Sequence, residues 1–262
     1  MLQTFKADLF RGRVALVTGS GTGIGAGIAQ AFAALGADVV LHDINAANLA
    51  ETAQKLSAGT GRIHALEADL SRQGAADQLF DQALAAGKRI DFLVNNAGRS
   101  LAATALESRE EQTQELIELN LKSVLWLSKR VIGHALERGG GASILQISST
   151  AGIAGYERRA VYCATKFGVI GLTKSLALDH ARDGIRVNAI LPHVVETEMF
   201  RRTAKPAEAD LWRAGIPMGR FATVDDVAGL AMFLCSPAGA YFTGGLYAVD
   251  GGAMAGPYGG DA

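Results

Sequence analysis

A tyrosine and a lysine stand four residues apart in the segment Tyr162-Cys163-Ala164-Thr165-Lys166. Residues with this spacing project from one face of a helix, one turn apart, so a phenol would lie beside an ammonium group. A free tyrosine titrates near ~10, but a nearby cation stabilises the phenolate and lowers that pKa. The pair therefore predicts a tyrosine that can exchange a proton at neutral pH.

A serine lies 13 residues before this tyrosine, at the end of the segment Ser143–Ser149. The segment reads as a strand, and a hydroxyl at its carboxyl end could hydrogen-bond the oxygen on which Tyr162 acts. A tyrosine–lysine pair alone also occurs on ordinary surface helices. Ser149, Tyr162 and Lys166 together have the residue types that acid/base chemistry on a substrate oxygen needs.

A second group of residues, near the N-terminus, indicates nucleotide binding. An apolar strand over 13–18 precedes the glycine-rich run Gly19–Gly25, and an alanine-rich helix is expected over 23–36. Glycines between a strand and a helix let backbone N–H groups approach a pyrophosphate, which the helix N-terminus stabilises. The next strand ends in Asp43, 20 residues after Gly23. At this spacing a carboxylate meets the adenosine ribose hydroxyls in a βαβ nucleotide fold.

Taken together, these two groups resemble the short-chain dehydrogenase/reductase family, and the resemblance covers nearly the whole chain. Further motifs of that family can be matched at the expected places along the sequence. The matches are Thr18, Gly19, Gly23 and Gly25 for the glycine motif, Asn95-Asn96-Ala97-Gly98, Asp69 after the third strand, Asn120 on a helix, Asn188–Pro192 and Val249–Gly252.

The resemblance implies a role for each matched position. Tyr162 would be the general acid/base and Ser149 would hold the substrate oxygen. Lys166 would lower the tyrosine pKa and hydrogen-bond the nicotinamide ribose, and Asn120 would order a water that relays the proton. The residues implied in cofactor binding are Gly19, Thr22, Gly23, Ile24, Gly25, Asp43, Asp69, Asn96, Ala97, Gly98, Tyr162, Lys166, Pro192, Val195 and Thr197.

The sequence favours NAD over NADP as the cofactor. Asp43 stands at the tip of the second strand, where the 2′-phosphate of NADP would lie, and a carboxylate repels a phosphate in a partly dry site. Family members that take NADP usually offer an arginine or lysine here or in the glycine loop. This loop offers only Ser20, Gly21 and Thr22.

The substrate pocket is less readable from the sequence. The resemblance implies a substrate lid at approximately 193–220 and gives three candidate contacts, Arg99, Arg159 and His193. Arg159, three residues before Tyr162, could hold the carboxylate of a hydroxy acid or could be a solvated residue at a helix start. His193 replaces the glycine that most family members have, and it could fill space, hydrogen-bond a substrate or point outward.

Composition and patterning predict an α/β protein with a Rossmann-type, doubly wound parallel sheet flanked by helices on both faces. Strands alternate with helices from residue 13 to residue 250 without a linker-like tract. Residues 1–262 are therefore interpreted as a single NAD(P)-binding domain. A hydrophobic content of 49% and 32 glycines suit a buried parallel sheet with tight turns.

Several classes of function are disfavoured. A net charge of −1 gives no electrostatic surface for nucleic acid. No run approaches ~18 apolar residues and the start of the chain lacks a signal-peptide core, so we expect no membrane partner and a cytoplasmic protein. Cys163 and Cys235 match no metal or redox spacing, so no metal is expected.

An oligomer is expected from two long helices, 109–137 and 160–182, which carry more apolar positions than one buried face needs. Trp126 and Phe167, on these helices, are interpreted as core or subunit-interface residues. The family resemblance implies a homotetramer built partly on these helices and on the C-terminal strand. The small, glycine-rich residues 253–262 either cross to a neighbouring subunit or are loose.

The sequence thus predicts an NAD-dependent enzyme that transfers a hydride between the cofactor and a small secondary alcohol or ketone, such as a polyol, sugar or hydroxy acid. One alternative is a ketone or 3-oxoacyl reductase, but Asp43 opposes the NADPH that such enzymes often use. Another is a catalytically silent dinucleotide-binding regulator. That class should have a broken catalytic set, whereas Asn120, Ser149, Tyr162 and Lys166 are all present.

Overall fold

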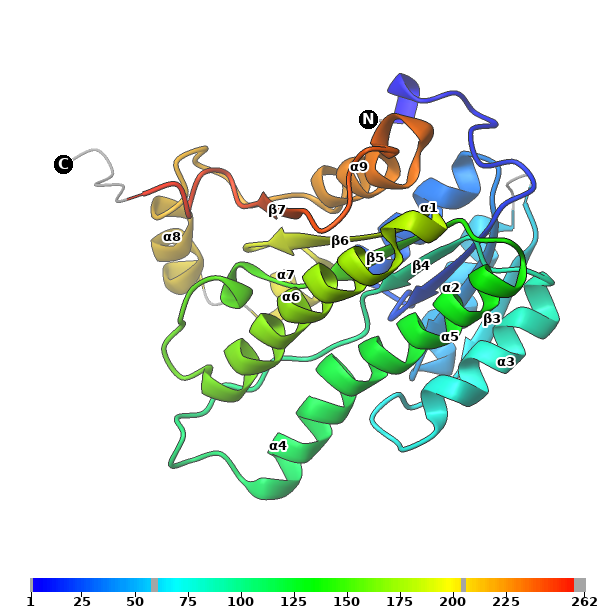
Figure 1. Cartoon of the computed structure of the whole chain (residues 1–262). Coiled ribbons are helices and arrows are strands. Elements are labelled where there is room, and N and C mark those ends of the chain that lie inside the picture. Colours follow the sequence, from blue (N-terminus) through cyan, green and yellow to red (C-terminus); the bar gives the residue numbers. More distant parts are fainter. Residues whose placement is uncertain (1, 58–60, 204–205, 257–262) are drawn as a thin grey trace.

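Seven parallel strands form the centre of the computed structural model, which describes residues 2–57, 61–203 and 206–256 (Figure 1). The strands lie in the order β3-β2-β1-β4-β5-β6-β7. This order, with every neighbouring pair parallel, confirms the predicted Rossmann-type doubly wound sheet. Their bounds are β1 Val14–Thr18, β2 Asp38–Asp43, β3 Ile63–Glu67, β4 Phe92–Asn95, β5 Ala142–Ile147, β6 Ile185–Pro192 and β7 Leu246–Val249.

Helices cover both faces of this sheet (Figure 1). One face packs against α1 Gly23–Ala34, α2 Ala46–Leu56 and α9 Val224–Cys235. The other packs against α3 Ala75–Gly87, α5 Ser123–Glu137 and α6 Ala160–His180. Because the central strands are buried on both faces, β1 is a continuous apolar run, with no polar residue alternating until Thr18.

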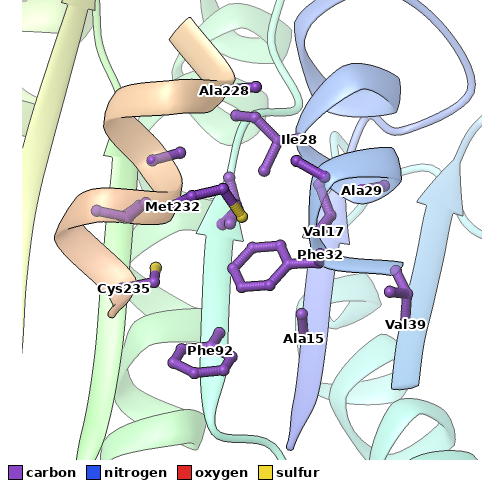
Figure 2. Packing of buried hydrophobic residues seen from close by; sticks show 14 of the residues in the cluster. Ala15, Val17, Ile28, Ala29, Phe32, Val39, Phe92, Ala228, Met232 and Cys235 are labelled. Carbon is purple, nitrogen blue, oxygen red and sulfur yellow. The ribbon is translucent and has the colours of Figure 1, made fainter. Parts of the chain in front are cut away.

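The core between α1, α9 and the sheet holds α1 in place (Figure 2). The rings of Phe10, Phe32 and Phe92 meet with centroids 5.0 to 5.2 Å apart. Ile28 of α1 and Met232 of α9 point into the same cluster. Full burial of one such side chain contributes roughly 1.5–3 kcal/mol. The N-terminus of α1 is therefore a rigid platform at the carboxyl edge of the sheet.

The helix predicted over 109–137 is divided into three parts. It consists of α4 Glu110–Ile117, a π turn at Glu118–Lys122 and α5. A π turn places one extra residue in the helical circuit, which a hydrophobic period does not reveal. The turn is fixed by the side chain of Asn120, which is fully buried and bonded to neighbouring segments.

Trp126 and Phe167, interpreted from the sequence as core or interface residues, lie at the surface of this chain. Trp126 on α5 and Phe167 on α6 are 43% and 49% exposed, so the interpretation that they are core residues is wrong. The core of this face is completed by other residues of the same helices, including Leu127 and Val131. The two rings remain at the surface, where the interface interpretation still applies to them.

Two short helices, α7 Glu198–Thr203 and α8 Pro206–Ala214, lie beyond the carboxyl ends of β6 and β7 (Figure 1). They fall within the segment predicted as a lid. The Phe200 ring meets Phe221 at 4.9 Å and Trp212 at 6.2 Å, which ties the two helices to the chain that follows. Residues 204–205 of the lid and 257–262 of the glycine-rich tail lie outside the described residues.

Candidate active site

The predicted site residues gather at the carboxyl ends of the strands from β1 to β6. β1 pairs with β2 on one side and β4 on the other, so the connections leaving β1 and β4 diverge. Open α/β sheets bind ligands in the crevice at such a switch point. Two cavities, of about 310 and 480 Å³, lie at this edge. Both are lined by Gly19, Thr22, Asn96, Gly98 and Arg99, so they are two halves of one groove.

The glycine loop at the start of α1 makes one wall of the groove. Gly19 has a φ of 62°, and a Cβ on Gly25 would lie 2.2 Å from the Gly19 carbonyl oxygen, so a side chain at either position would force the loop to change. Thr22 is the N-cap of α1, and its side chain makes no capping hydrogen bond. The first N–H groups of α1 are thus available to an external acceptor, which fits the pyrophosphate of a dinucleotide.

Asn96 fastens this loop to the end of β4. Its Nδ2 donates to the carbonyl oxygens of Thr18 at 3.0 Å and Gly19 at 2.9 Å. The Thr18 hydroxyl in turn accepts the backbone N–H groups of Asn96 and Ala97, both at 3.0 Å. The Asn96 amide therefore sets the shape of the loop, while Ala97 and Gly98 line the groove itself.

Asp43 lies against the glycine loop in the larger half of the groove. Its Oδ2 accepts the backbone N–H of Gly21 at 2.9 Å, and its Oδ1 accepts that of Asn45 at 3.0 Å. Asp69 lines the same cavity, and its carboxylate accepts hydrogen bonds from Ser71 and Arg72. This end of the groove therefore offers carboxylate acceptors at the place expected for an adenosine ribose.

His42, just before Asp43, is a structural residue. It is 2% exposed, and burial lowers its pKa, which favours the neutral ring. Its Nδ1 lies 3.4 Å from the Gly19 backbone nitrogen, and its Nε2 lies 3.1 Å from the Ala68 carbonyl oxygen. A proton on Nε2 satisfies both contacts, so the ring bridges the glycine loop and the end of β3.

Ser149 follows β5 and meets the phenol of Tyr162. It is the N-cap of a short 3₁₀ turn, Thr150–Gly152, and accepts the backbone N–H of Ala151 at 3.1 Å. Its hydroxyl also lies near enough to Tyr162, in the first turn of α6, to favour the phenolate and so to oppose the rise that burial causes in the Tyr162 pKa. Ser148 instead donates its hydroxyl to the Lys166 carbonyl oxygen at 3.1 Å. The fold thus brings Ser149, and not Ser148, to the phenol.

Lys166 is buried one helical turn after Tyr162. Its ammonium group donates to the Ile147 carbonyl oxygen at 2.9 Å and lies 5.8 Å from the centre of the Tyr162 ring. Burial lowers the pKa of Lys166 to about 8. Burial also raises the pKa of Tyr162, and this outweighs the opposing effect of the nearby Ser149 hydroxyl. The prediction that Lys166 gives Tyr162 a low pKa is therefore wrong for the free protein, because the phenol is desolvated and the ammonium is bonded to Ile147.

Asn120 joins the loop after β4 to α6. Its Oδ1 accepts the Arg99 N–H at 3.1 Å, and its Nδ2 donates to the Arg99 carbonyl oxygen at 2.9 Å and the Thr165 hydroxyl at 3.3 Å. Thr165 immediately precedes Lys166 on α6. Asn120 thus fixes the distance between the two walls of the groove, and π turns such as the one that carries it recur at functional sites.

A cluster of three polar side chains, Thr150, Tyr156 and His193, begins at the residue after Ser149. The Thr150 hydroxyl is 2.8 Å from the Tyr156 hydroxyl, and His193 Nδ1 lies 3.2 Å from the first and 3.1 Å from the second. His193 therefore faces inward. Thr150 was not predicted from the sequence. Its position directly after Ser149 was the signal that could have identified it.

Two of the three candidate substrate contacts are arginines, and they differ in whether a carboxylate pairs with them. Arg99 pairs with Glu115, so its charge is already compensated. Arg159 is the N-cap of α6, and its guanidinium makes one long hydrogen bond, 3.4 Å to the Arg158 carbonyl oxygen. Among the residues that the structure describes, no carboxylate pairs with Arg159. Arg159 is thus a half-buried cation near Tyr162 with donors left for a ligand.

The chain after β6 folds over the glycine loop. Pro192 ends β6, and Val195 is buried and forms a bridge with Ala222. A Cβ on Gly23 would lie 3.3 Å from the Thr197 side chain, which shows how closely this segment approaches the start of α1. Thr197 lines the smaller half of the groove together with Thr22, Ile24, Tyr162 and Lys166.

Comparison with known proteins shows which family has this arrangement. Residues 19–254 match the family model described as enoyl-(acyl carrier protein) reductase. The chain is 40% identical over 250 residues to 2-dehydro-3-deoxy-D-gluconate 5-dehydrogenase of Bacillus subtilis, covering 92% of this chain and 94% of the relative. It is 37% identical over 241 residues to D-threitol dehydrogenase of Mycolicibacterium smegmatis, covering 92% of each chain. The chain belongs to the short-chain dehydrogenase/reductase family.

Solved structures of this family have the same fold. A protein assigned as a short-chain alcohol dehydrogenase of Sinorhizobium meliloti matches with a TM-score of 0.90 at 32% identity, over 96% of this chain and 100% of that one. A protein assigned as an NAD(P)-dependent gluconate 5-dehydrogenase of Beutenbergia cavernae, with NADP bound at low occupancy, matches with a TM-score of 0.89 at 37% identity, over the same shares.

Membership of the short-chain dehydrogenase/reductase family makes this chain an oxidoreductase that uses a nicotinamide cofactor. In the part of the chain that the structure describes, no group of three or more His, Cys, Asp or Glu residues could hold a metal ion. No described helix has both the length and the apolar character that crossing a membrane requires.

Proposed function

We propose that this short-chain dehydrogenase/reductase is an NAD-dependent dehydrogenase that oxidises a secondary alcohol in a polyol or a sugar acid. The observation that carries the proposal is that the Tyr162 phenol, with Ser149 close to it and Lys166 one turn further along α6, lines a groove that leads to Asp43. A carbinol oxygen placed against both hydroxyls would lie next to the smaller half of the groove. That half is where the nicotinamide ring of a cofactor with its ribose at Asp43 would reach.

The residues of this site supply proton transfer and positioning. The cofactor, when bound, would accept a hydride from the carbinol carbon. Tyr162 as a phenolate would accept the hydroxyl proton, while Ser149 donates a hydrogen bond to the same substrate oxygen. The N-terminus of α6 and the positive charge of the oxidised nicotinamide both favour the phenolate, against the effect of burial. Lys166 would hold the nicotinamide ribose, and Asn120 keeps the two walls at their distance.

Asp43 supports NAD as the preferred cofactor. Its carboxylate is held at the glycine loop by the Gly21 and Asn45 N–H groups, so it cannot swing away from a 2′-phosphate without breaking both bonds. Arg72 lines the same cavity and is the residue best placed to attract a phosphate. Its guanidinium already pairs with Asp69 at 3.1 Å, so its charge is partly compensated. We therefore infer a preference for NAD, although a relative binds NADP.

The polar wall beside the catalytic serine supports a substrate with several hydroxyl groups. Thr150 and Tyr156 place two hydroxyls around one ring nitrogen of His193. The other ring nitrogen makes no hydrogen bond within the described residues and is free for a substrate hydroxyl or carboxylate. Arg159 adds a cation that suits a sugar acid. D-threitol and 2-dehydro-3-deoxy-D-gluconate dehydrogenases among the relatives act on molecules of these two kinds.

One alternative has an observation in its favour. The chain is 35% identical over 242 residues to a 3-oxoacyl-[acyl-carrier-protein] reductase of Thermotoga maritima. Tyr162 would then give its proton to a ketone oxygen held by Ser149, and the reduced cofactor would supply the hydride to the carbonyl carbon. A catalytically silent regulator has no such support, because its defining feature would be a lost serine, tyrosine or lysine.

A substrate panel tests the proposal. Polyols, sugar acids, simple secondary alcohols and, in reverse, a 3-oxoacyl thioester are assayed with NAD(H) and NADP(H) by nicotinamide absorbance. We expect the highest kcat/KM for a polyol or sugar acid with NAD, at least ~10-fold above a simple secondary alcohol, since a site with polar groups left unpaired disfavours apolar substrates. If thioester reduction by NADPH is the best reaction, the 3-oxoacyl alternative is correct. Cofactor binding without turnover of any compound would favour the regulator.

A further inference from the structure

A second cavity, of about 540 Å³, lies at the opposite edge of the sheet from the active-site groove. Its walls come from the segments that lead into β1, β4, β5 and β6 and from the end of α9. Phe92 and Cys235, at the lower end of the core in Figure 2, form part of its inner wall. No residue proposed for dehydrogenase chemistry lines it.

Positive charge predominates in this cavity. Its lining contains four arginines, and among the described residues that line it Asp91 is the only acid. Four positive charges and one negative charge leave a formal excess of three. The arginines come from four separate places in the sequence: Arg13, Arg89, Arg138 and Arg186.

Asp91 compensates only one of these positive charges, because three of the arginines share its single carboxylate. Oδ1 accepts hydrogen bonds from Arg13, at 3.1 Å, and from Arg89, and lies 3.5 Å from an Arg138 nitrogen. Oδ2 accepts the Val14 backbone N–H at 3.0 Å. Burial raises the pKa of Asp91, but these donors outweigh burial and keep the pKa below its usual value. One charged carboxylate therefore faces three guanidinium groups.

The arginines also retain donors that the described chain does not satisfy. The Nε atoms of Arg89 and Arg138 are buried and have no hydrogen-bond partner. Arg186 is half-buried and donates to the Phe242 carbonyl oxygen at 3.1 Å, and no carboxylate pairs with it among the described residues. Buried N–H donors and cations without partners cost free energy, and an oxyanion would satisfy both deficits at once.

We propose that this cavity binds a small, multiply charged oxyanion, such as a phosphate ester or a polycarboxylate. Guanidinium groups recognise planar carboxylate and phosphate oxygens through paired hydrogen bonds, and a concave wall of low dielectric strengthens the attraction. Solvated surface arginines of this chain behave differently. Arg62, for example, is 67% exposed and pairs one-to-one with Asp38.

Calorimetric titration of the NADH-saturated protein tests the site, because NADH fills the active-site groove that could otherwise take up phosphate. The titrants are sodium pyrophosphate and sodium citrate, each against sodium chloride of equal ionic strength. We expect saturable binding of at least one, with one site per chain. Pyrophosphate without citrate would identify a phosphate ligand, and citrate without pyrophosphate a polycarboxylate.

Variants connect the binding to the cavity. Arg186→Gln and Arg138→Gln should each weaken binding by about tenfold or more, the effect of losing one charge-assisted hydrogen bond. Arg186→Lys, which keeps the charge, should retain part of the affinity and so separates charge loss from misfolding. Arg109→Gln, at the start of α4 and remote from the cavity, is the matched control and should bind as the parent does.

The proposal would be overturned if neither titrant bound to the parent, or if Arg109→Gln weakened binding as much as Arg186→Gln and Arg138→Gln do. Binding of a nicotinamide cofactor follows from family membership, and NADPH takes the place of NADH in the titration if the parent prefers it. These results therefore do not depend on which substrate the enzyme oxidises.

Discussion

At the scale of single residues, we propose that Asp43 determines the preference for NAD over NADP. Its carboxylate should accept the adenosine ribose hydroxyls and repel a 2′-phosphate, so the parent should prefer NAD over NADP by at least ~1–3 kcal/mol in kcat/KM. Asp43→Asn keeps acceptor oxygen for Gly21 but removes the charge, and it should narrow this gap by harming NAD more than NADP. Steady-state kinetics with both cofactors measure the effect. Equal kcat/KM values for NAD and NADP in the parent would show that Asp43 does not discriminate between the two cofactors.

Arg159 carries the prediction about acidic substrates. Its guanidinium has no carboxylate partner in the described part of the chain and could form a charge-assisted pair worth roughly 1.5–3 kcal/mol with a substrate carboxylate. Arg159→Ala should raise KM for a sugar acid by about tenfold or more and change KM for a neutral polyol far less.

The structure also decides the control for that substitution. Arg158 adopts a φ of 56° outside α6 and pairs with Glu107 at 2.9 Å, so its loss would disturb the loop. Arg182→Ala, at the far end of α6 and exposed, is the better control. If Arg159→Ala and Arg182→Ala change KM by the same small amount for both substrates, Arg159 does not bind a substrate carboxylate. The sugar-acid part of the proposal would then have no residue to support it.

Residue types and spacing were enough to select the residues that now surround the groove, because strand ends and helix periods fix where side chains emerge. They could not give the Thr150–Tyr156–His193 cluster, since its members come from two separate connections, after β5 and after β6, whose approach depends on the whole fold. They also gave the wrong direction for the Tyr162 pKa. Burial, which a spacing argument does not contain, dominates that value.

At the scale of elements, α9 is predicted to depend on a capping box. The Thr223 hydroxyl accepts the Asp226 N–H, and the Asp226 carboxylate accepts the Thr223 N–H at 2.7 Å. The hydrogen bond from Arg220 is the largest of the effects that lower the pKa of Asp226 to about 2. Asp226→Asn should reduce the free energy of unfolding by about 1 kcal/mol at neutral pH, after allowance for solvent screening.

The stability lost in Asp226→Asn should depend on pH, and the lowered pKa of Asp226 determines in which direction. A carboxyl whose pKa is lower in the folded than in the unfolded state stabilises the fold above its unfolded pKa, and the stabilisation disappears as pH falls towards the folded value. The difference between the parent and Asp226→Asn, from urea unfolding, should therefore shrink from about pH 5 to about pH 3. Asp225→Asn, exposed in the same turn, is the control. A difference that stays constant over this range would contradict the role of the charge.

The π turn marks the limit of prediction at this scale. Strand and helix positions followed from apolar runs and glycines, with ends shifted by one or two residues: α1 ends at Ala34 and α6 at His180. The interruption at Glu118–Lys122 was hidden, because its apolar residues continue the helical pattern. Its cause is a tertiary contact, the bonds of Asn120 to Arg99 and Thr165.

At the scale of the whole molecule, we propose a homotetramer that uses the exposed faces of α5 and α6. Trp126, Phe167 and Leu178 are 43%, 49% and 83% exposed, and the last two lie three turns apart on one face of α6. Phe167→Glu should place a charge in this interface and lower the mass measured by light scattering at a fixed protein concentration.

Leu106→Glu is the control for the assembly prediction, because Leu106 is fully exposed on a loop outside these helices. Its mass should equal that of the parent. A monomeric parent, or an unchanged mass for Phe167→Glu, would mean that these apolar side chains serve no interface between copies of the chain.

The sheet also separates two chemistries in space. The groove with Asp43, Ser149 and Tyr162 occupies the carboxyl edge, and the arginine-lined cavity occupies the amino edge. The first could be predicted because strand ends in a doubly wound sheet define it. The second could not, since its four arginines share no motif or spacing in the sequence.

The central claim, that Tyr162 is the proton acceptor of a dehydrogenase, is tested most directly by single-turnover hydride transfer in Tyr162→Phe, with the best substrate from the panel. The ring remains, so NADH affinity should stay within a few-fold of the parent. The acid/base is lost, so the rate of hydride transfer should fall by at least ~10²-fold. Intact cofactor binding with hydride transfer within a few-fold of the parent would contradict the account.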